Sequence, residues 1–363
     1  MILCANPAAQ FRSYQSEIEE AVLLVMRSDR YVLGAEVELL ESEFAEYIGV
    51  CSAIGVANGT DALELALRAL DVGHGDEVIT VSHTAVATIA AIEAAGAKAV
   101  LVDVDPQFYT LNPLQLESVF TENTKAVIAV HLYGQAADLD PIADFCSKYN
   151  IPLVEDVSQA HGAKYKGQRL GSIGDIGCFS CYPTKNLGAI GDAGLITTNN
   201  SDLASKLRMI REYGWCDRVS RYVGRNSRLD ELQAAILQIK LQHLDADNGK
   251  RRKIAEYYTS QLDGYPIQTP SVREGAEHVF HLFVIQVDER DAILEYLKER
   301  GVFAGIHYPN PVHLQPAYQG RLRTASNVSV TESICNTIIS LPMYPELSLN
   351  ETEAVVGSLK SYF

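Results

Sequence analysis

Short hydrophobic runs and segments of helical periodicity alternate between residues 77 and 156. Runs rich in valine and isoleucine predict buried strands, and segments with apolar positions three and four apart predict helices. The predicted strands are 77–82, 98–104, 125–134 and 151–156, and the helices between them are 84–95, 113–120 and 138–149. Strands that alternate with helices in this way predict parallel βαβ units with right-handed crossovers.

Polar and aromatic side chains lie at the carboxyl ends of these predicted strands or just past them. They are Ser82, His83, Tyr133, Asp156 and Gln159. Open parallel sheets bind ligands at the carboxyl ends of their strands. We therefore expect these side chains to gather at one edge of the sheet, around a ligand.

The N-terminal region adds helices at 15–26 and 36–47, a strand at 52–57 and a helix that ends near Leu70. At the start of that last helix, Thr60 is expected to be the capping residue. The first N–H groups of a helix and its positive end attract anions. Gly59 and Thr60 are therefore candidates for binding a phosphate, although an ordinary capped helix would show the same residues.

The second half of the chain predicts a further domain. A helix is predicted at 201–213, and apolar positions three and four apart from Leu229 to His243 predict a long helix. Its continuation is polar and basic around 246–255, which indicates a helical link. Beyond it we expect a strand at 281–287, a helix at 290–299 and further strand structure near 302–306. The predicted domains are therefore 1–245 and 246–363.

Composition narrows the class of protein. The chain has 363 residues, of which 47% are hydrophobic and 21% charged, as in ordinary globular proteins. Its 46 acidic and 30 basic residues give a net charge of −16, which disfavours binding to nucleic acid or anionic membranes. A negatively charged ligand would need local positive groups. No signal peptide and no membrane-spanning segment are expected from the sequence.

The cysteines indicate a protein of the reducing cytoplasm, because their number, seven, is odd and they are scattered along the chain. Cys178 and Cys181 form a C-x-x-C pair, which could indicate a redox or zinc site. No second pair exists, and in an extended segment these two side chains would point to opposite faces. We therefore predict neither a metal site nor a redox site.

A glycine-rich stretch at 176–198 is centred on Lys185. A short strand-like run ends at Ser180, a turn follows at Pro183, and three glycines precede the next extended run. Such a backbone can bend tightly and approach a ligand closely. Alone, Lys185 would be a surface lysine on a turn. Together with Asp156 it indicates a pyridoxal phosphate enzyme, in which lysine holds the aldehyde as an imine and the acid keeps the pyridine nitrogen protonated.

Two common phosphate-binding motifs are absent. No G-x-G-x-x-G follows a predicted strand, so a dinucleotide-binding fold is not supported. Lys185 is preceded by Pro-Thr and not by glycine, so it is not the lysine of a P-loop.

Four segments in order resemble the sugar aminotransferases of the DegT/DnrJ/EryC1/StrS family. They are NGTDALELALRAL (58–70), EDVSQAHGA (155–163), FSCYPTKNLGAIGDAG (179–194) and NSRLDELQAAIL (226–237). The resemblance covers nearly the whole chain. It implies an α/β protein with the aspartate aminotransferase fold (fold type I), with a mostly parallel seven-stranded sheet in the large domain and a smaller C-terminal α/β domain.

The resemblance also implies roles for individual residues. Lys185 and Asp156 would be catalytic, and Gln159 would bind the phenolic oxygen of pyridoxal phosphate. The residues implied to hold its phosphate are Gly59, Thr60, Ser180 and Asn226. Since Asn226 would come from the other subunit, the resemblance implies an obligate homodimer with shared active sites.

The chain departs from the family pattern at two positions. Relatives place an aromatic ring over the cofactor where this chain has Ala85, so His83 is the nearest ring that could stack there, unless it caps the following helix. Relatives also have a small apolar residue where this chain has Arg225, and the role of this arginine is open.

The implied reaction transfers an amino group from glutamate, which becomes 2-oxoglutarate, to a nucleotide-linked keto sugar. Arg228 would grip the donor carboxylate through two parallel hydrogen bonds. The other candidate substrate residues are Tyr182, His307, Tyr308 and His313, although the proline-rich segment around the histidines could equally be a structural loop.

The segments HYPNPVHLQPAY and SLPMYPEL are most similar to members that aminate C3 of sugars such as dTDP-3-keto-6-deoxyhexoses, as in polysaccharide or antibiotic sugar synthesis. Amination of a 4-keto sugar or of a UDP-linked 3-keto sugar is an alternative. Two further alternatives are a dehydratase of the same fold and a non-catalytic regulator. Lys185 disfavours the first, and Lys185 with Asp156 disfavours the second.

Overall fold

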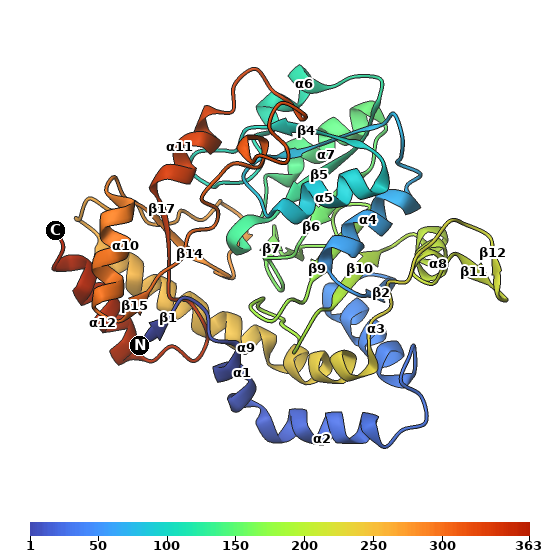
Figure 1. The fold of residues 1–363 in the computed structure, drawn as a ribbon, viewed down its shortest axis with the longest axis horizontal. Helices are drawn as coiled ribbons and strands as arrows, with labels where there is room; N and C mark the ends of the chain where they lie inside the picture. Colours follow the sequence, from blue (N-terminus) through green and yellow to red (C-terminus); the bar gives the residue numbers. More distant parts are fainter.

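The computed structural model describes residues 1–363, and its centre is an eight-stranded sheet (Figure 1). In spatial order the strands are β16 (Arg323–Thr324), β4 (Lys98–Val102), β3 (Glu77–Val81), β5 (Thr124–Val130), β6 (Leu153–Asp156), β9 (Ile176–Ser180), β10 (Gly194–Thr198) and β2 (Ser52–Val56). Only the β9–β10 and β10–β2 pairs are antiparallel. The mostly parallel sheet is therefore confirmed, with one strand more than predicted.

The additional strand is β16, which comes from the C-terminal region and extends the sheet beside β4. Remaining strands are short: β1 (Ile2–Leu3), β7 (Lys164–Tyr165), β8 (Gln168–Arg169), β11 (Trp215–Cys216), β12 (Val219–Ser220), β13 (Ala276–Glu277), β14 (Phe283–Gln286), β15 (Val302–Phe303) and β17 (Ile338–Leu341). Of these, β14 pairs with β17, and β11 pairs with β12 in a hairpin that projects at the right of Figure 1.

The α-helices are α1 (Pro7–Ser13), α2 (Gln15–Met26), α3 (Ala35–Ile48), α4 (Gly59–Ala69), α5 (Val86–Ala95), α6 (Leu116–Val119), α7 (Leu139–Tyr149), α8 (Ser201–Ile210), α9 (Glu231–Leu262), α10 (Arg290–Glu299), α11 (Ser329–Thr337) and α12 (Leu349–Lys360). Short 3-10 turns lie at Pro113–Gln115, Leu132–Gly134 and Val312–Leu314. The predicted helices 15–26 and 290–299 match α2 and α10. None of the helices combines the length and apolarity needed to cross a membrane.

The chain has two hydrophobic cores, one at each end of α9. The larger core packs around the eight-stranded sheet, and the smaller one is formed by the second half of α9 together with β14, β17, α10 and α12. Ile2 of β1 belongs to the smaller core, because β1 pairs in parallel with β15. The boundary predicted at 245/246 falls inside α9, which continues without a break through the polar link, and the domain limits stay a prediction.

Candidate active site

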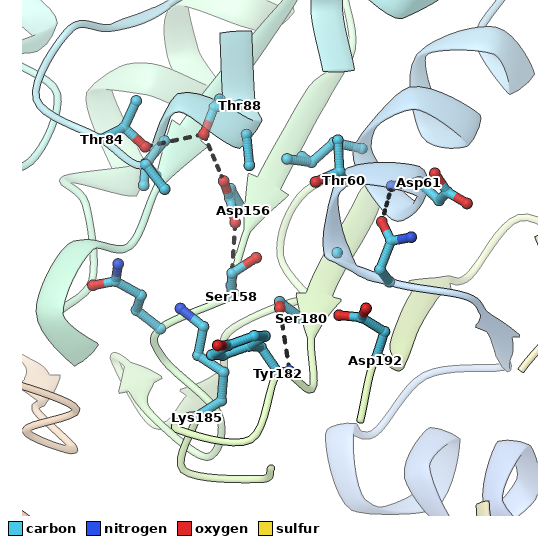
Figure 2. A pocket seen from close by; sticks show the side chains of 17 residues that line it. Thr60, Asp61, Thr84, Thr88, Asp156, Ser158, Ser180, Tyr182, Lys185 and Asp192 are labelled. Carbon is cyan, nitrogen blue, oxygen red and sulfur yellow. Dashed lines mark hydrogen bonds between the residues drawn. The ribbon is translucent and has the colours of Figure 1, made fainter. Parts of the chain in front are cut away.

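A cavity of about 450 Å³ lies at the carboxyl ends of β6 and β9, next to the first turn of α4. The predicted residues that line it are Gly59, Thr60, Asp156, Gln159, Ser180, Tyr182 and Lys185. Figure 2 shows that these side chains reach the cavity from different elements and that Lys185 and Asp156 enter it from different sides. Of the residues expected around a ligand at the carboxyl ends of the strands, Asp156 and Gln159 line the cavity, whereas Ser82, His83 and Tyr133 do not.

Lys185 lies on a tight turn that follows β9. The turn is closed by main-chain hydrogen bonds from Lys185 N to Tyr182 O and from Ala189 N to Cys181 O, both 2.8 Å long. Its ammonium group has no hydrogen-bond partner within the chain. Burial lowers the pKa of Lys185 to about 8, an effect that the negative charge of Asp156 opposes. A lysine with this pKa is in part a neutral amine at physiological pH, as a nucleophile must be.

Asp156 ends β6 and is held in place by two donors. Its carboxylate accepts hydrogen bonds from the Thr88 hydroxyl and from Ser158 N, each 3.1 Å long, and the residue is 4% exposed. Thr88 is itself paired with Thr84 at 3.0 Å (Figure 2). The carboxylate is thus fixed at the cavity wall, where it can face a protonated nitrogen of a ligand.

The first turn of α4 forms the other end of the cavity. Its cap is Asn58, whose side-chain oxygen accepts from Asp61 N at 2.8 Å, so the prediction that Thr60 caps this helix is wrong. Asn58 precedes the helix, and its short side chain reaches forward to the N–H of Asp61, the third residue of the helix. Thr60 already lies inside the first turn. At Gly59, a Cβ atom would lie 2.4 Å from the Cβ of Ser180. The helix start therefore touches Ser180 and leaves N–H groups directed at the cavity.

Gln159 is held from both sides at the cavity wall. Its side-chain oxygen accepts from Tyr133 N at 2.8 Å, and its side-chain nitrogen donates to the Tyr308 hydroxyl at 3.0 Å. Tyr308 is thereby brought next to the cavity, although it is not part of the cavity wall.

His83 is not at the cavity, contrary to the expectation that its ring could stack on a cofactor. The side chain is 1% exposed, and Nε2 lies 2.6 Å from the hydroxyl of Tyr133. Burial lowers the pKa of His83 to about 4, so the ring is neutral. The turn after β3 directs His83 into the protein and leaves Ala85 at the cavity wall, where no ring is present.

Asn226 and Arg228 do not reach the cavity of their own chain. Asn226 is exposed and forms a β-bridge with Glu212, and the guanidinium of Arg228 pairs with the Glu212 carboxylate at 3.2 Å. Arg225, whose role was open, pairs with the carboxylates of Asp61 and Glu64 on α4. This arginine therefore ties its segment to the helix that begins at the cavity.

The two histidines proposed for the substrate are engaged elsewhere. His307 pairs through Nδ1 with the Ser340 hydroxyl at 2.8 Å, and His313 lies between Ser82 at 2.7 Å and Glu332 at 3.2 Å. Neither lines the cavity. Burial and then the charge of Lys185 lower the pKa of His307 to about 4, which keeps this ring neutral.

Sequence reasoning missed several polar residues of the cavity wall. They are Asn58, Asp61, Thr84, Thr88, Ser158 and Asp192. Asn58 was recognisable as a capping residue, and Thr84 and Thr88 stand four apart at the start of a helix. Nothing in the sequence marked Asp192 as a cavity residue except its position among glycines.

The residues present fit pyridoxal phosphate. Lys185 offers an amine without a partner, Asp156 offers an anchored carboxylate, and the contact between Gly59 and Ser180 leaves backbone N–H groups for a phosphate. These groups line one cavity, which has room for a small aromatic ligand.

Comparison with known proteins agrees with this assignment. The family model described as the DegT/DnrJ/EryC1/StrS aminotransferase family matches residues 12–360. A dTDP-3-amino-3,6-dideoxy-alpha-D-galactopyranose transaminase of Aneurinibacillus thermoaerophilus is 48% identical over 350 residues, which are 96% of each chain. The crystal structure of DesV from S. venezuelae is 41% identical, with a TM-score of 0.97 over 99% of this chain and 98% of that one.

The cofactor prediction is confirmed by the family match and by a further relative. The crystal structure of ntda from Bacillus subtilis, with bound cofactor PMP, is 31% identical, with a TM-score of 0.88 over 96% of this chain and 82% of that one. PMP is the amine form of pyridoxal phosphate. The chain belongs to the DegT/DnrJ/EryC1/StrS aminotransferase family of pyridoxal phosphate enzymes, and its fold is fold type I.

Proposed function

We propose that this protein transfers the amino group of glutamate to C3 of a dTDP-linked 3-keto-6-deoxyhexose, giving 2-oxoglutarate and the 3-amino sugar nucleotide. The observation that carries the proposal is the juxtaposition of the free amine of Lys185 and the anchored carboxylate of Asp156 in one cavity. The similarity to a relative named for a dTDP-3-amino sugar supports the choice of sugar.

Lys185 and Asp156 divide the catalytic work in this proposal. When bound, pyridoxal phosphate supplies an aldehyde that carries the amino group and a ring that accepts electrons. Lys185 would hold that aldehyde through its amine and, as a free base, would move a proton at the donor's α-carbon. Asp156 would keep a proton on the ring nitrogen. The hydrogen bonds from Thr88 and Ser158 keep this carboxylate in position.

The remaining cavity residues bind and orient. Gly59, Thr60 and Ser180 would hold the phosphate through the helix start and the serine hydroxyl. Gln159 would donate to the phenolic oxygen, since its side-chain oxygen is already used by Tyr133 N. Tyr182, which is 53% exposed at the cavity, would contact the sugar. Ala85 leaves one face of the cavity without a stacking ring.

The proposal includes a homodimer with shared sites. Three carboxylates, those of Asp61, Asp156 and Asp192, line the cavity, but only one cation does, so a sugar diphosphate would need positive groups from elsewhere. Asn226 and Arg228 do not reach their own cavity, and the hairpin before them exposes the apolar side chains of Trp215, Val219, Tyr222 and Val223. A partner's cavity is where Asn226 would bind phosphate and Arg228 the glutamate carboxylate. Exposed apolar side chains of this kind are typical of an interface.

A two-step experiment tests the reaction. Visible spectra of the purified protein with pyridoxal phosphate are recorded before and after glutamate is added. We expect the band of the lysine-bound cofactor to be replaced by that of the amine form, with the 2-oxoglutarate released. Lys185→Ala is the control and should show neither the band of the lysine-bound cofactor nor its replacement by the band of the amine form. A panel of dTDP- and UDP-linked 3-keto and 4-keto sugars is then offered to the amine form.

The outcomes separate the alternatives. Return of the first band with dTDP-3-keto-6-deoxyhexose, together with an amino sugar product, supports the proposal. Faster turnover of a 4-keto or UDP-linked sugar would replace the substrate but keep the reaction. A product that has lost a hydroxyl group would indicate a dehydratase. A protein that binds the cofactor but leaves glutamate unchanged would favour a regulator.

A further inference from the structure

Tyr133 lies where three segments of the chain meet at the back of the cavity. It follows β5 in the turn Leu132–Gly134 and is 3% exposed. Its N–H donates to the side-chain oxygen of Gln159 at 2.8 Å, and its carbonyl accepts from Leu282 N at 3.3 Å. Its hydroxyl donates to the main-chain carbonyl of His307. Tyr133 thus contacts Gln159 in the cavity wall, Leu282, and the segment 306–310.

The backbone of Tyr133 is in an unusual conformation. Its φ of 62° and ψ of 0° lie in the left-handed region, which residues other than glycine seldom adopt. This conformation turns the N–H toward Gln159 while the ring points in another direction, to His83 and His307. Such conformations persist where the surrounding contacts impose them, and they cluster at functional sites.

The hydroxyl of Tyr133 has a defined donor and a defined acceptor. Because a carbonyl can only accept, the single hydroxyl hydrogen goes to His307 O, and the nitrogen Nε2 of His83, at 2.6 Å, must be the donor to the hydroxyl oxygen. Neutral His83 then accepts at Nδ1 from the Cys335 thiol, 3.6 Å away. Every polar atom in this buried chain of groups is therefore used, and the hydroxyl cannot turn away from His307.

The main-chain N–H of Tyr133 also fixes the amide of Gln159. An N–H can only donate, so the side-chain oxygen of Gln159 faces Tyr133 and its nitrogen faces the Tyr308 hydroxyl, at 3.0 Å, and the cavity. Tyr308 belongs to the segment 306–310, whose other tie to Tyr133 is the carbonyl of His307. Hydrogen bonds therefore connect Tyr133 to Gln159, Gln159 to Tyr308, and Tyr133 to His307, which precedes Tyr308 in the chain. These four residues form a closed cycle of contacts.

We propose that Tyr133 is a positioning residue of this active site, which fixes Gln159 and the segment 306–310 relative to each other and to the cavity. Through its hydroxyl it sets where Tyr308 lies beside the cavity that would hold the sugar nucleotide. This role rests on the proposed function only in its choice of ligand. Gln159 lines the cavity and Tyr308 lies next to Gln159, whereas Tyr133 acts through them.

Tyr133→Phe tests the proposal, because it removes the hydroxyl and keeps the ring and the main-chain contact to Gln159. Tyr109→Phe is a matched control. Tyr109 is equally buried, packs against the Tyr133 ring at 5.8 Å and also has a positive φ, but its hydroxyl accepts from Gln286. Amide hydrogen exchange of the holoenzymes is measured first, followed by KM and kcat for the sugar nucleotide and by the rate of the glutamate step.

In Tyr133→Phe we expect amide exchange at Gly305 and Val312, the hydrogen-bonded amides that flank 306–310, to accelerate about tenfold. KM for the sugar nucleotide should also rise about tenfold, as for one lost hydrogen bond. The glutamate step should change by less than about twofold, since Lys185 and Asp156 are untouched. Tyr109→Phe should change neither quantity. A general loosening of the core would instead affect both variants and both steps.

Unchanged exchange at Gly305 and Val312 in Tyr133→Phe, or equal acceleration in Tyr109→Phe, would overturn the proposal. If Tyr133→Phe does not fold, His83→Phe replaces it. His83→Phe removes the donor to the Tyr133 hydroxyl and should accelerate exchange of the same amides. Exchange at the wild-type rate in this variant would contradict the proposal. Hydrogen exchange decides this inference even if the wild-type enzyme aminates no nucleotide sugar, a result that would refute the proposed function alone.

Discussion

At Lys185, two physical effects act in opposite directions on one ammonium group. Burial removes water and favours the neutral amine, while the carboxylate of Asp156 favours the cation. Burial is the larger effect, and the resulting pKa of about 8 lies below the ordinary value of 10.5. Lys185 can therefore attack an aldehyde near neutral pH. The Asp156 carboxylate limits how far burial lowers the pKa of Lys185.

The pH dependence of cofactor uptake follows from this balance. The neutral amine is the reactive form, and its fraction increases as pH rises through the pKa. Uptake of pyridoxal phosphate by the apoenzyme, followed by stopped-flow absorbance, should therefore accelerate with pH and reach half its maximum near pH 8, where an ordinary lysine would require 10.5.

Two variants separate the causes. Asp156→Asn removes the charge that raises the pKa of Lys185, so the midpoint should move to lower pH. Asp192→Asn neutralises another carboxylate of the same cavity that does not contribute to the shift, and its midpoint should stay at the wild-type value. A midpoint above pH 10 in the wild type, or equal shifts in both variants, would contradict this account.

Single residues also show what the sequence could and could not predict. Lys185 and Asp156 were predictable, because each follows a predicted strand and their chemistry is complementary. His83 also follows a strand, but the direction of its side chain depends on the turn, and its partner Tyr133 is 50 residues away. The cap of α4 was misplaced because both Asn58 and Thr60 are capping residue types.

At the scale of elements, the junction between α4 and β9 shapes the phosphate end of the cavity. α4 begins at Gly59 and β9 ends at Ser180, and the two residues touch. The strand β10 passes beside them, where a Cβ atom at Gly194 would lie 2.5 Å from Asn58 O. Glycine is required at both positions because the helix start approaches the sheet so closely.

Gly59→Ala tests this junction. The added Cβ would lie 2.4 Å from the Cβ and 2.9 Å from the Cα of Ser180, so the helix start must shift. We expect overpacking to cost about 1–3 kcal/mol, as a lower Tm of the apoenzyme and a weaker Kd for pyridoxal phosphate. The measurements are thermal unfolding and a cofactor titration.

Gly357→Ala is the matched control. Gly357 is a helical glycine of α12 with open space around it, so alanine there should raise stability by about 0.5–1 kcal/mol and leave cofactor affinity unchanged. Adding Ser180→Gly to Gly59→Ala should restore part of the lost stability, because it removes the Cβ contact at 2.4 Å and leaves the contact with the Cα at 2.9 Å. Wild-type cofactor affinity in Gly59→Ala would mean that the close contact does not shape the phosphate site.

Strands and helices were predicted unequally for physical reasons. The buried parallel strands were visible because both faces of the sheet are covered and their sequences are continuously apolar. β16 has only two residues, one of them exposed, and pairs with β4 across more than 200 positions. No local pattern marks such a strand.

At the scale of the whole molecule, α9 joins the two cores, and the cavity lies at the sheet of the larger core. The segment 306–310, whose Ile306 and Tyr308 pack against the larger core, comes within reach of the cavity through Tyr308. The lining of the cavity is nevertheless poor in positive charge, since Lys185 is its only cation. In the homodimer that we propose, a second chain would supply the positive groups that a diphosphate needs.

Mixing two inactive variants tests whether the sites are shared. Lys185→Ala lacks the catalytic amine but retains Asn226, and Asn226→Ala has the opposite composition. If Asn226 acts in the partner's cavity, each mixed dimer contains one site with both residues intact. After unfolding and refolding together at equal amounts, half of the dimers are mixed, so about a quarter of the wild-type activity should appear.

The contrasting result is equally clear, because a mixed dimer has no intact site if Asn226 serves its own chain. Activity would then stay at the average of the two separate variants. Wild-type protein carried through the same refolding procedure corrects for losses, and Lys185→Ala mixed with Asp156→Asn is a negative control, because both residues line one chain's cavity and no site is restored. Since Asn226 is exposed and has no side-chain partner in its own chain, its removal should leave the fold intact, and any gain on mixing reports the shared site.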